Sequence, residues 1–264
     1  MRLILLANSY KHQGRCIAGI SLDSGEWIRP VSPADDGRIP TDDPHIPVPE
    51  LHLLDIVHIP VTDARGPGHE RENRLYTTGA WRVEGRAEVT HLLTYREWEF
   101  LYPNFGRKIP YTYLEKQRPV RTLQLIEAKQ IRWERNEFGK CRAYILDDIF
   151  DCADIGFSIT DPVIISKLEQ GQSISSHCLL CLSLSQPFQG RNDTEKMCYR
   201  LVAGVIELLP EIELIAQEMQ RVGWTIPQGR AYLRQHFAKE SRYQLTALEA
   251  QAFLDVLRQL PALE

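Results

Sequence analysis

Short apolar runs separated by turn-forming residues dominate the first 206 positions. LILLA (residues 3–7), residues 16–22 and LLDIVHIPV (53–61) have the length and alternation of strands, and Asp23-Ser24-Gly25 predicts a hairpin turn that returns through Trp27 and Ile28. Residues 30–49 contain six prolines and several aspartates. Proline removes backbone donors and both residue types favour turns, so this stretch predicts a long ordered loop.

The middle of the chain continues in the same style. Strands are expected around Gly85, over 121–135 and 141–150 on either side of a turn at 136–139, and in PVIIS (162–166), HCLLCLSLSQPF (177–188) and MCYRLVAGVIEL (197–208). The segment 94–105 has Trp98, Leu101 and Tyr102 at helical spacing and predicts a short helix. Many short strands favour barrels or sandwiches over a doubly wound α/β sheet.

The end of the chain differs in kind. Apolar residues recur at helical spacing from Pro210, and Gly223 marks a stop. Thr225 with Gln228, and Thr246 with Glu249, match the capping-box pattern and predict helices that begin at about 226 and 247. The predicted fold is mainly β with α, organised as two small β-barrels over residues 1–118 and 119–206 and a helical module over 207–264.

Composition is that of a globular protein: 264 residues, 43% hydrophobic and 25% charged. The apolar run at the N-terminus is too short for a signal-peptide core, and no apolar stretch of about 18 residues follows, so we expect a cytoplasmic protein with no membrane partner. The six cysteines are irregularly spaced and are expected to be reduced thiols.

The net charge of −4 is unevenly distributed. Residues 65–142 carry 16 basic and 10 acidic side chains, whereas 1–64 carry 5 and 9 and 143–222 carry 5 and 12. Charges farther apart than about 10 Å are screened at 0.1 M salt, so a local basic surface can bind phosphates despite the overall sign.

Several sequence words together carry a family resemblance. NSYKHQGRCIAGISLDSGEWIRPVS (8–32), DIVHIPV (55–61), LCLSLSQPF (180–188) and YRLVAGVIE (199–207) resemble the dual OB-fold domain proteins of bacteria, in which two OB-type barrels are fused in one chain. The likeness covers about residues 1–206. It implies a nucleic-acid-associated role, in defence or genome maintenance, and brings no catalytic residues. The tail from Gly223 looks like a helical module that follows DNA-annealing and replication-related domains in some cyanobacterial proteins.

OB barrels bind oligonucleotides through a basic groove and aromatic rings on which bases stack. Aromatic and basic residues are interleaved over 100–144, and a second cluster lies on the N-terminal hairpin. The candidate nucleic-acid-binding residues are Lys11, Arg15, Trp27, Arg29, Arg107, Lys108, Tyr111, Tyr113, Arg118, Arg121, Trp133, Arg135, Lys140 and Arg142. The alternative is that half of these aromatics are core and the cations a solvated face.

Arg29 precedes a proline, which holds it extended, and this could aim its guanidinium at a phosphate or a base edge. The alternative is that Trp27 packs in the barrel while Arg29 pairs with an acidic loop residue such as Asp35 or Asp36.

Metal and catalytic motifs are weak. Cys178 and Cys181 match C-x-x-C, but the segment is an apolar strand and lacks the tight turn of a zinc knuckle, so buried thiols are the better account. Asp35, Asp36, Asp42 and Asp43 could hold a divalent cation but are typical turn formers. No Gly-rich phosphate loop or hydrolase motif is present, and no cofactor is expected.

The sequence therefore predicts a non-enzymatic module that binds single-stranded DNA or RNA by backbone neutralisation and base stacking. Two alternatives stay open: an adaptor without nucleic-acid affinity, which could bind a protein through the C-terminal helices, and a metal-dependent nuclease that uses the aspartate loop. The oligomeric state, the choice between DNA and RNA and any base preference are left open.

Overall fold

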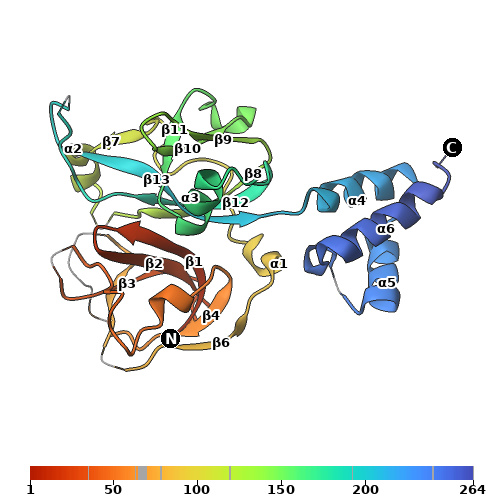
Figure 1. Ribbon diagram of the computed structural model, residues 1–264, viewed down its shortest axis with the longest axis horizontal. Helices are drawn as coiled ribbons and strands as arrows, with labels where there is room; N and C mark the ends of the chain where they lie inside the picture. Colours follow the sequence, from red (N-terminus) through yellow and green to blue (C-terminus); the bar gives the residue numbers. More distant parts are fainter. Residues whose placement is uncertain are drawn as a thin grey trace. The chain divides into compact units, whose positions relative to one another are not determined.

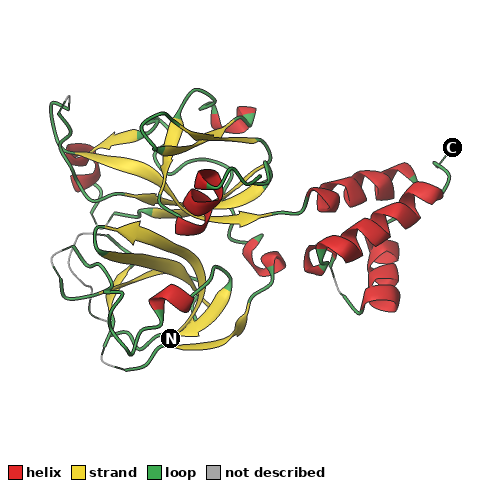
Figure 2. Cartoon of the chain, in the orientation of Figure 1, coloured by secondary structure: helices red, strands yellow, loops and turns green. Residues whose placement is uncertain are grey.

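The computed structural model describes residues 1–34, 36–62, 64, 70–77, 79–118, 120–191, 193–239 and 241–263 (Figure 1). The chain divides into two compact units, one formed by Met1–Ala87 with Arg96–Ile206 and the other by Glu88–Tyr95 with Glu207–Glu264. The first unit is built mainly of strands and the second of helices (Figure 2).

The first sheet closes into a small barrel. Its described strands are β1 (Arg2–Lys11), β2 (Gly14–Ser21), β3 (Trp27–Val31), β4 (Asp55–His58), β5 (Asn73–Leu75) and β6 (Arg82–Arg86). β1, β2 and β3 form an antiparallel meander, β3 pairs in parallel with β5, and β4 pairs with the other edge of β1. An antiparallel bridge between Val61 and Tyr76, just after β4 and β5, closes the ring.

Alternation along these strands explains the barrel core. Leu3 and Leu5 of β1, Ile17 of β2 and Ile28 of β3 are buried inside it with Trp81. In each of these strands the residues next to the buried ones point out of the barrel, since successive side chains of a strand face opposite sides. The proline-rich stretch after β3 is a long connection with one short helical turn, η1 (Val48–Glu50).

The second sheet closes in the same way. Its described strands are β7 (Lys108–Pro110), β8 (Leu123–Ala128), β9 (Ile131–Arg135), β10 (Cys141–Ile145), β11 (Gly156–Ile159), β12 (Cys178–Leu184) and β13 (Met197–Glu207). Their order is β8-β12-β13-β11-β10-β9, with β7 paired to β13. Only Lys129 and Gln130 separate β8 from β9, so these two act as one bent strand that completes the ring.

Both rings have the connectivity of a five-stranded OB barrel: a meander of three strands, then a fourth and a fifth strand that close it. In the first barrel these are β1 to β5. In the second they are β8–β9, β10, β11, β12 and β13, with η2 (Asp148–Phe150) between β10 and β11 and α3 (Pro162–Glu169) between β11 and β12. The predicted fold class is confirmed.

The two barrels pack closely within this unit. A Cβ atom added at Gly204 of β13 would lie 1.9 Å from the carbonyl oxygen of Leu6 on β1. The backbone N–H of Tyr10, near the end of β1, donates to the carbonyl of Thr160 just after β11 at 2.9 Å. β13 therefore crosses β1 with room for a hydrogen atom and no more at position 204.

Two predicted elements are wrong: tertiary contacts override the helix predicted over 94–105, and a helix cap overrides the strand predicted over 162–166. Residues 94–105 are not helical, because Glu97 forms a bridge with Ile126 of β8 and Phe100 packs into the second barrel core. The 162–166 segment is helical, because the Asp161 side chain accepts hydrogen bonds from the N–H groups of Val163 and Ile164 and so caps α3.

The connection between the barrels holds β7 and the short helix α2 (Tyr111–Glu115). Tyr199 of β13 pairs with Lys108 of β7, so β7 belongs to the second sheet. The predicted domain boundary at residue 118 falls after β7.

The helical unit contains α1 (Val89–Leu92), α4 (Pro210–Arg221), α5 (Ile226–Phe237), η3 (Arg242–Gln244) and α6 (Ala247–Gln259). Capping boxes at Thr225 and Thr246 begin α5 and α6, which confirms the predicted helix starts. Phe253 lies fully buried in the core of this unit, stacked on Tyr232 with ring centroids 4.9 Å apart. None of the described helices is both long and apolar enough to span a bilayer.

Candidate nucleic-acid interface

The outward face of β10 and β11 carries basic and aromatic side chains. Arg142 and Tyr144 of β10 alternate with buried residues, and their cross-strand partners on β11 are Ser158 and Gly156. Arg132 of the neighbouring strand β9 places its guanidinium carbon 4.2 Å from the centroid of the Tyr144 ring. Because OB barrels bind oligonucleotides on the face of their second and third strands, this is the expected binding face of the second barrel.

Arg107, which lies just before β7, adds a second positive charge near this face. Partial burial and the nearby positive charge of Arg107 both lower the pKa of Arg142. Arg142 donates to the Ser158 hydroxyl, and the salt bridges found among the described residues include neither Arg107 nor Arg142. Two neighbouring guanidinium groups with no carboxylate partner would attract an anion.

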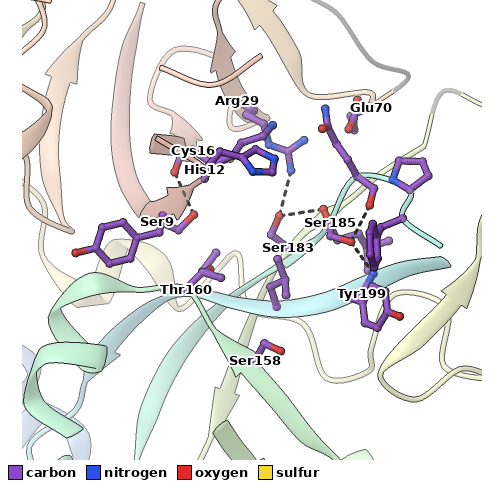
Figure 3. Close-up of a pocket in the computed structure, with 18 residues that line it drawn as sticks. Ser9, His12, Cys16, Arg29, Glu70, Ser158, Thr160, Ser183, Ser185 and Tyr199 are labelled. Atoms are coloured by element: carbon purple, nitrogen blue, oxygen red, sulfur yellow. Dashed lines mark hydrogen bonds between the residues drawn. The ribbon is translucent and has the colours of Figure 1, made fainter. Parts of the chain in front are cut away.

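A pocket of about 470 Å³ opens beside this face, between the β1–β2 hairpin of the first barrel and strands β11, β12 and β13 of the second. Figure 3 shows Ser9 and Cys16 of the first barrel across from Ser158 and Ser183 of the second. The volume lies within the range of about 300–1,000 Å³ that is usual for small-molecule sites. Ser158 lines the pocket and also accepts the hydrogen bond from Arg142, so the pocket and Arg142 are adjacent.

Three aromatic residues line the pocket. Tyr10 is 52% exposed and Phe188 is 63% exposed, and Tyr199 is half-buried. Phe188 lies in the connection between β12 and β13, where its backbone pairs with Met197. This is the loop between the fourth and fifth strands, which in OB barrels helps to form the oligonucleotide site.

The rim of the pocket is tied together across the barrels. The backbone carbonyl of Asp36 in the first barrel accepts hydrogen bonds from Lys11 of β1 and from the Gln186 side chain after β12. Lys11 was predicted to bind nucleic acid, and it lies at this rim. Arg15, also predicted, stacks its guanidinium 4.4 Å from the centroid of the Tyr10 ring.

Arg29 requires a correction. The residue is 5% exposed, and its guanidinium donates to Asn73 of the first barrel and to Thr122 and Ser183 of the second. The carboxylate of buried Glu72 lies 3.6 Å away. Arg29 therefore joins the barrels at the floor of the pocket, with Glu72 as its counter-ion in place of the aspartates expected from the loop. It is not a surface contact for phosphate.

Asp35 lies outside the described residues, and Asp36 pairs with Arg38 and does not face Arg29. Trp27 is half-buried and lines a separate hollow with Arg121, whose guanidinium pairs with Glu97. These two predicted residues lie together, away from the pocket lining.

Lys108 is held by one carboxylate of its own barrel. Its ammonium nitrogen lies 2.5 Å from the Asp193 carboxylate, which also accepts a 2.5 Å hydrogen bond from the Tyr199 hydroxyl. These contacts lower the pKa of Asp193 and raise that of Lys108. The cluster fixes the β12–β13 loop against β13, next to the pocket.

The other predicted residues fall into two groups. On α2 and just after it, Tyr113 packs on Phe105 with ring centroids 4.8 Å apart, and Arg118 donates to the Tyr111 hydroxyl and pairs with Glu115. On the β9–β10 hairpin, Arg135 and Lys140 are exposed, whereas Trp133 packs against the barrel core and donates from Nε1 to Ser175. The structure thus gives Tyr113 and Trp133 packing roles.

Tyr10, Phe188 and Tyr199 were missed because they lie outside the basic segment of the sequence. The alternation of Arg142 and Tyr144 in CRAYI was a usable signal for the β10 face, and the sequence LSLSQPF gave no comparable one for Phe188.

Metal ligands are not assembled in the part of the chain that the structure describes. No group of three or more His, Cys, Asp or Glu side chains there is placed to hold an ion. Cys178 lies in the second barrel core, whereas Cys181 lies close enough to Arg29 for the guanidinium charge to oppose the burial that raises the Cys181 pKa. The two thiols therefore point to opposite faces of β12.

The fold and the interface define a protein with two OB barrels. The family model for the dual OB-containing domain matches residues 1–205, and the chain belongs to this family. No curated protein and no solved structure matches the chain. OB barrels bind oligonucleotides and oligosaccharides, so the family fits nucleic-acid binding or another role of this fold.

Proposed function

We propose that the protein binds single-stranded nucleic acid on the outward face of β10 and β11 and in the adjoining pocket, and that it catalyses no reaction. The observation that carries this proposal is the outward β10–β11 face, where Arg142 and Tyr144 lie beside Arg132 and the charge of Arg107 is close by. Burial lowers the pKa of Arg142, and the repulsion between the like charges of Arg107 and Arg142 lowers it further. A phosphate would offset that repulsion.

The surroundings of the pair favour a polynucleotide over a small anion. Tyr144 lies on the same face, and Tyr10, Phe188 and Tyr199 line the pocket next to it. Aromatic rings beside cations match the needs of an unpaired strand, whose phosphates are neutralised while its bases stack. A base paired within a duplex offers no free face, so single strands should bind more tightly than duplexes.

Fluorescence anisotropy with labelled single-stranded DNA, single-stranded RNA and duplex DNA, over a series of salt concentrations, tests the proposal. Each phosphate neutralised on a single strand contributes about −0.7 to the slope of log K against log salt. The variant with Arg107→Ala and Arg142→Ala should bind more weakly, and its slope should be shallower by about 1.4. The matched control carries Arg82→Ala and Arg258→Ala, which remove two exposed arginines from β6 and α6.

Equal loss in both double variants would mean that net charge alone governs binding, and the assigned face would be wrong. Absence of binding to all three probes at low salt would refute the proposal and favour a protein-docking role for the barrels.

A further inference from the structure

We propose that the pocket between the barrels holds one nucleobase that is unstacked from the strand, and that it prefers bases with an exocyclic amino group. The polynucleotide part of this inference rests on the proposed function. The pocket itself can be tested with mononucleotides, independently of any strand.

The size and position of the pocket fit a single nucleotide. Its volume of about 470 Å³ lies toward the lower end of the range for small ligands. Arg142 donates to Ser158 at the pocket wall, so a base inside would leave its phosphate near the Arg107–Arg142 pair. Proteins that read single strands commonly splay out unstacked bases in this way.

The aromatic residues provide stacking. Phe188 and Tyr10 are more than half exposed although both line the pocket, so their rings retain free surface. Tyr199 is anchored by its hydroxyl on Asp193 at 2.5 Å. A ring that is already fixed loses little conformational freedom when a base stacks on it.

The hydroxyl groups that line the pocket supply the proposed selectivity. Ser9 donates its hydroxyl hydrogen to the carbonyl of Cys16, and Thr160 donates to that of Val202. Ser183 donates to Leu184 and Ser185 to Gln186, in each case to the backbone carbonyl. With these hydrogens in use, each oxygen keeps a lone pair for a ligand, although Ser183 already accepts from Arg29 and Ser185 from the Tyr199 N–H.

Other polar groups reinforce this acceptor character. The Gln186 side chain donates through Nε2 to the Asp36 carbonyl, which fixes the amide, and its carbonyl oxygen can accept a further hydrogen bond. The Glu70 carboxylate, 6% exposed, also lines the pocket. Two of the charged donors in the lining are already engaged: the Lys11 ammonium donates to the Asp36 carbonyl, and the Arg29 guanidinium donates to Asn73, Thr122 and Ser183. The acceptors of the wall therefore suit the amino group of adenine, cytosine or guanine better than the corresponding carbonyl of uracil or thymine.

Two ligand pairs test the contribution of the amino group, and in each pair the adjacent ring nitrogen also changes from an acceptor to an N–H donor. CMP and UMP differ at the position that carries an amino group in cytosine and a carbonyl in uracil, and AMP and IMP differ in the same sense. Calorimetric titration of the full chain should show CMP binding about 3- to 10-fold tighter than UMP, the amount expected for one hydrogen bond. AMP should exceed IMP by a similar factor.

Two variants and one control assign the effect to the pocket. Leu201→Trp fills the pocket from β13 and should abolish CMP binding. Phe188→Ala removes an exposed ring and should weaken CMP by about 5- to 150-fold, the usual range for a stacked base. Trp98→Ala removes an aromatic ring that is 53% exposed outside the pocket and should leave CMP affinity unchanged.

The outcomes separate the two proposals. If labelled strands bind but none of the four mononucleotides does, the pocket inference fails and the proposed function stands. If CMP binds and is lost in Phe188→Ala while no strand binds, the pocket stands and the proposed function fails. Equal affinity for CMP and UMP, or equal loss in Phe188→Ala and Trp98→Ala, would also overturn the inference.

Discussion

Equivalent faces of the two barrels carry an arginine in opposite circumstances. Arg29 lies on the face of β2 and β3 in the first barrel, is 5% exposed and has the carboxylate of Glu72 3.6 Å away. Arg142 lies on the face of β10 and β11 in the second barrel, is half-buried and has Arg107 as its charged neighbour. The first barrel therefore uses this face to join its partner barrel, whereas the second leaves it available to a ligand.

The difference shows how one fold serves two purposes in one chain. A buried guanidinium needs a counter-charge and hydrogen-bond acceptors, and Arg29 has both. Two arginines without a carboxylate are tolerable only where solvent or a ligand reaches them. Burial with a counter-ion thus distinguishes a structural arginine from one that stays accessible to a ligand, although both stand in OB strands.

The largest expected effect comes from removing the buried arginine. Arg29→Met leaves Glu72, whose side chain is 2% exposed, without its counter-ion, and should destabilise the protein by about 3–5 kcal/mol. Arg142→Met should change stability by less than about 1 kcal/mol, because its single hydrogen bond to Ser158 can be replaced by water. Urea unfolding measures the free energy of unfolding of both variants.

A second variant tests whether charge burial is the cause. Adding Glu72→Gln to Arg29→Met removes the orphaned charge and keeps an acceptor for the Thr122 N–H, which donates to Glu72 at 2.9 Å. The double variant should recover part of the lost stability. A double variant less stable than Arg29→Met would show that the carboxylate acts in some other way than as a counter-ion.

The crossing of β13 over β1 gives the next effect. Gly204→Ala puts a Cβ atom 1.9 Å from the Leu6 carbonyl oxygen, so the backbones must separate, at a cost of about 1–3 kcal/mol. Gly85→Ala on β6 is the matched control, because no atom lies within 4 Å of its added Cβ. An equal shift of the thermal unfolding midpoint in both variants would contradict the proposed close approach of β13 and β1.

Sequence alone was sufficient for the barrels and the helical tail. Alternation and turn residues placed most strands, capping boxes placed α5 and α6, and family resemblance supplied the barrel connectivity. The 94–105 segment failed because Phe100 stacks on Phe150 of the second barrel, a contact that local spacing does not reveal. Tertiary packing outweighed helical spacing there.

The site was predictable only in part. Residues Arg107 and Arg142 stood out because cations and aromatics are dense between them. Tyr10 and Phe188 meet at one pocket although they are far apart in the chain, so only the packing of the barrels brings them together. Arg29 was misjudged because its partners Thr122 and Ser183 come from the other barrel.

The smallest expected effect concerns the loop that carries Phe188. The contacts with Lys108 and Tyr199 hold the pKa of Asp193 below its ordinary value of 3.8. A carboxyl whose pKa is lower in the folded state stabilises it above pH 3.8, and this contribution is lost as pH falls through the folded-state pKa. Asp193→Asn should therefore be slightly less stable than the native protein near pH 6, with a difference that shrinks below pH 3.8. A difference in stability that stayed constant between pH 6 and 3 would place the stabilisation in neutral hydrogen bonds.

The first barrel has a comparable aspartate outside the pocket lining. Asp23 has a lowered pKa through its exposed contact with Arg2. Because Asp23 does not line the pocket, Asp23→Asn should leave CMP affinity unchanged.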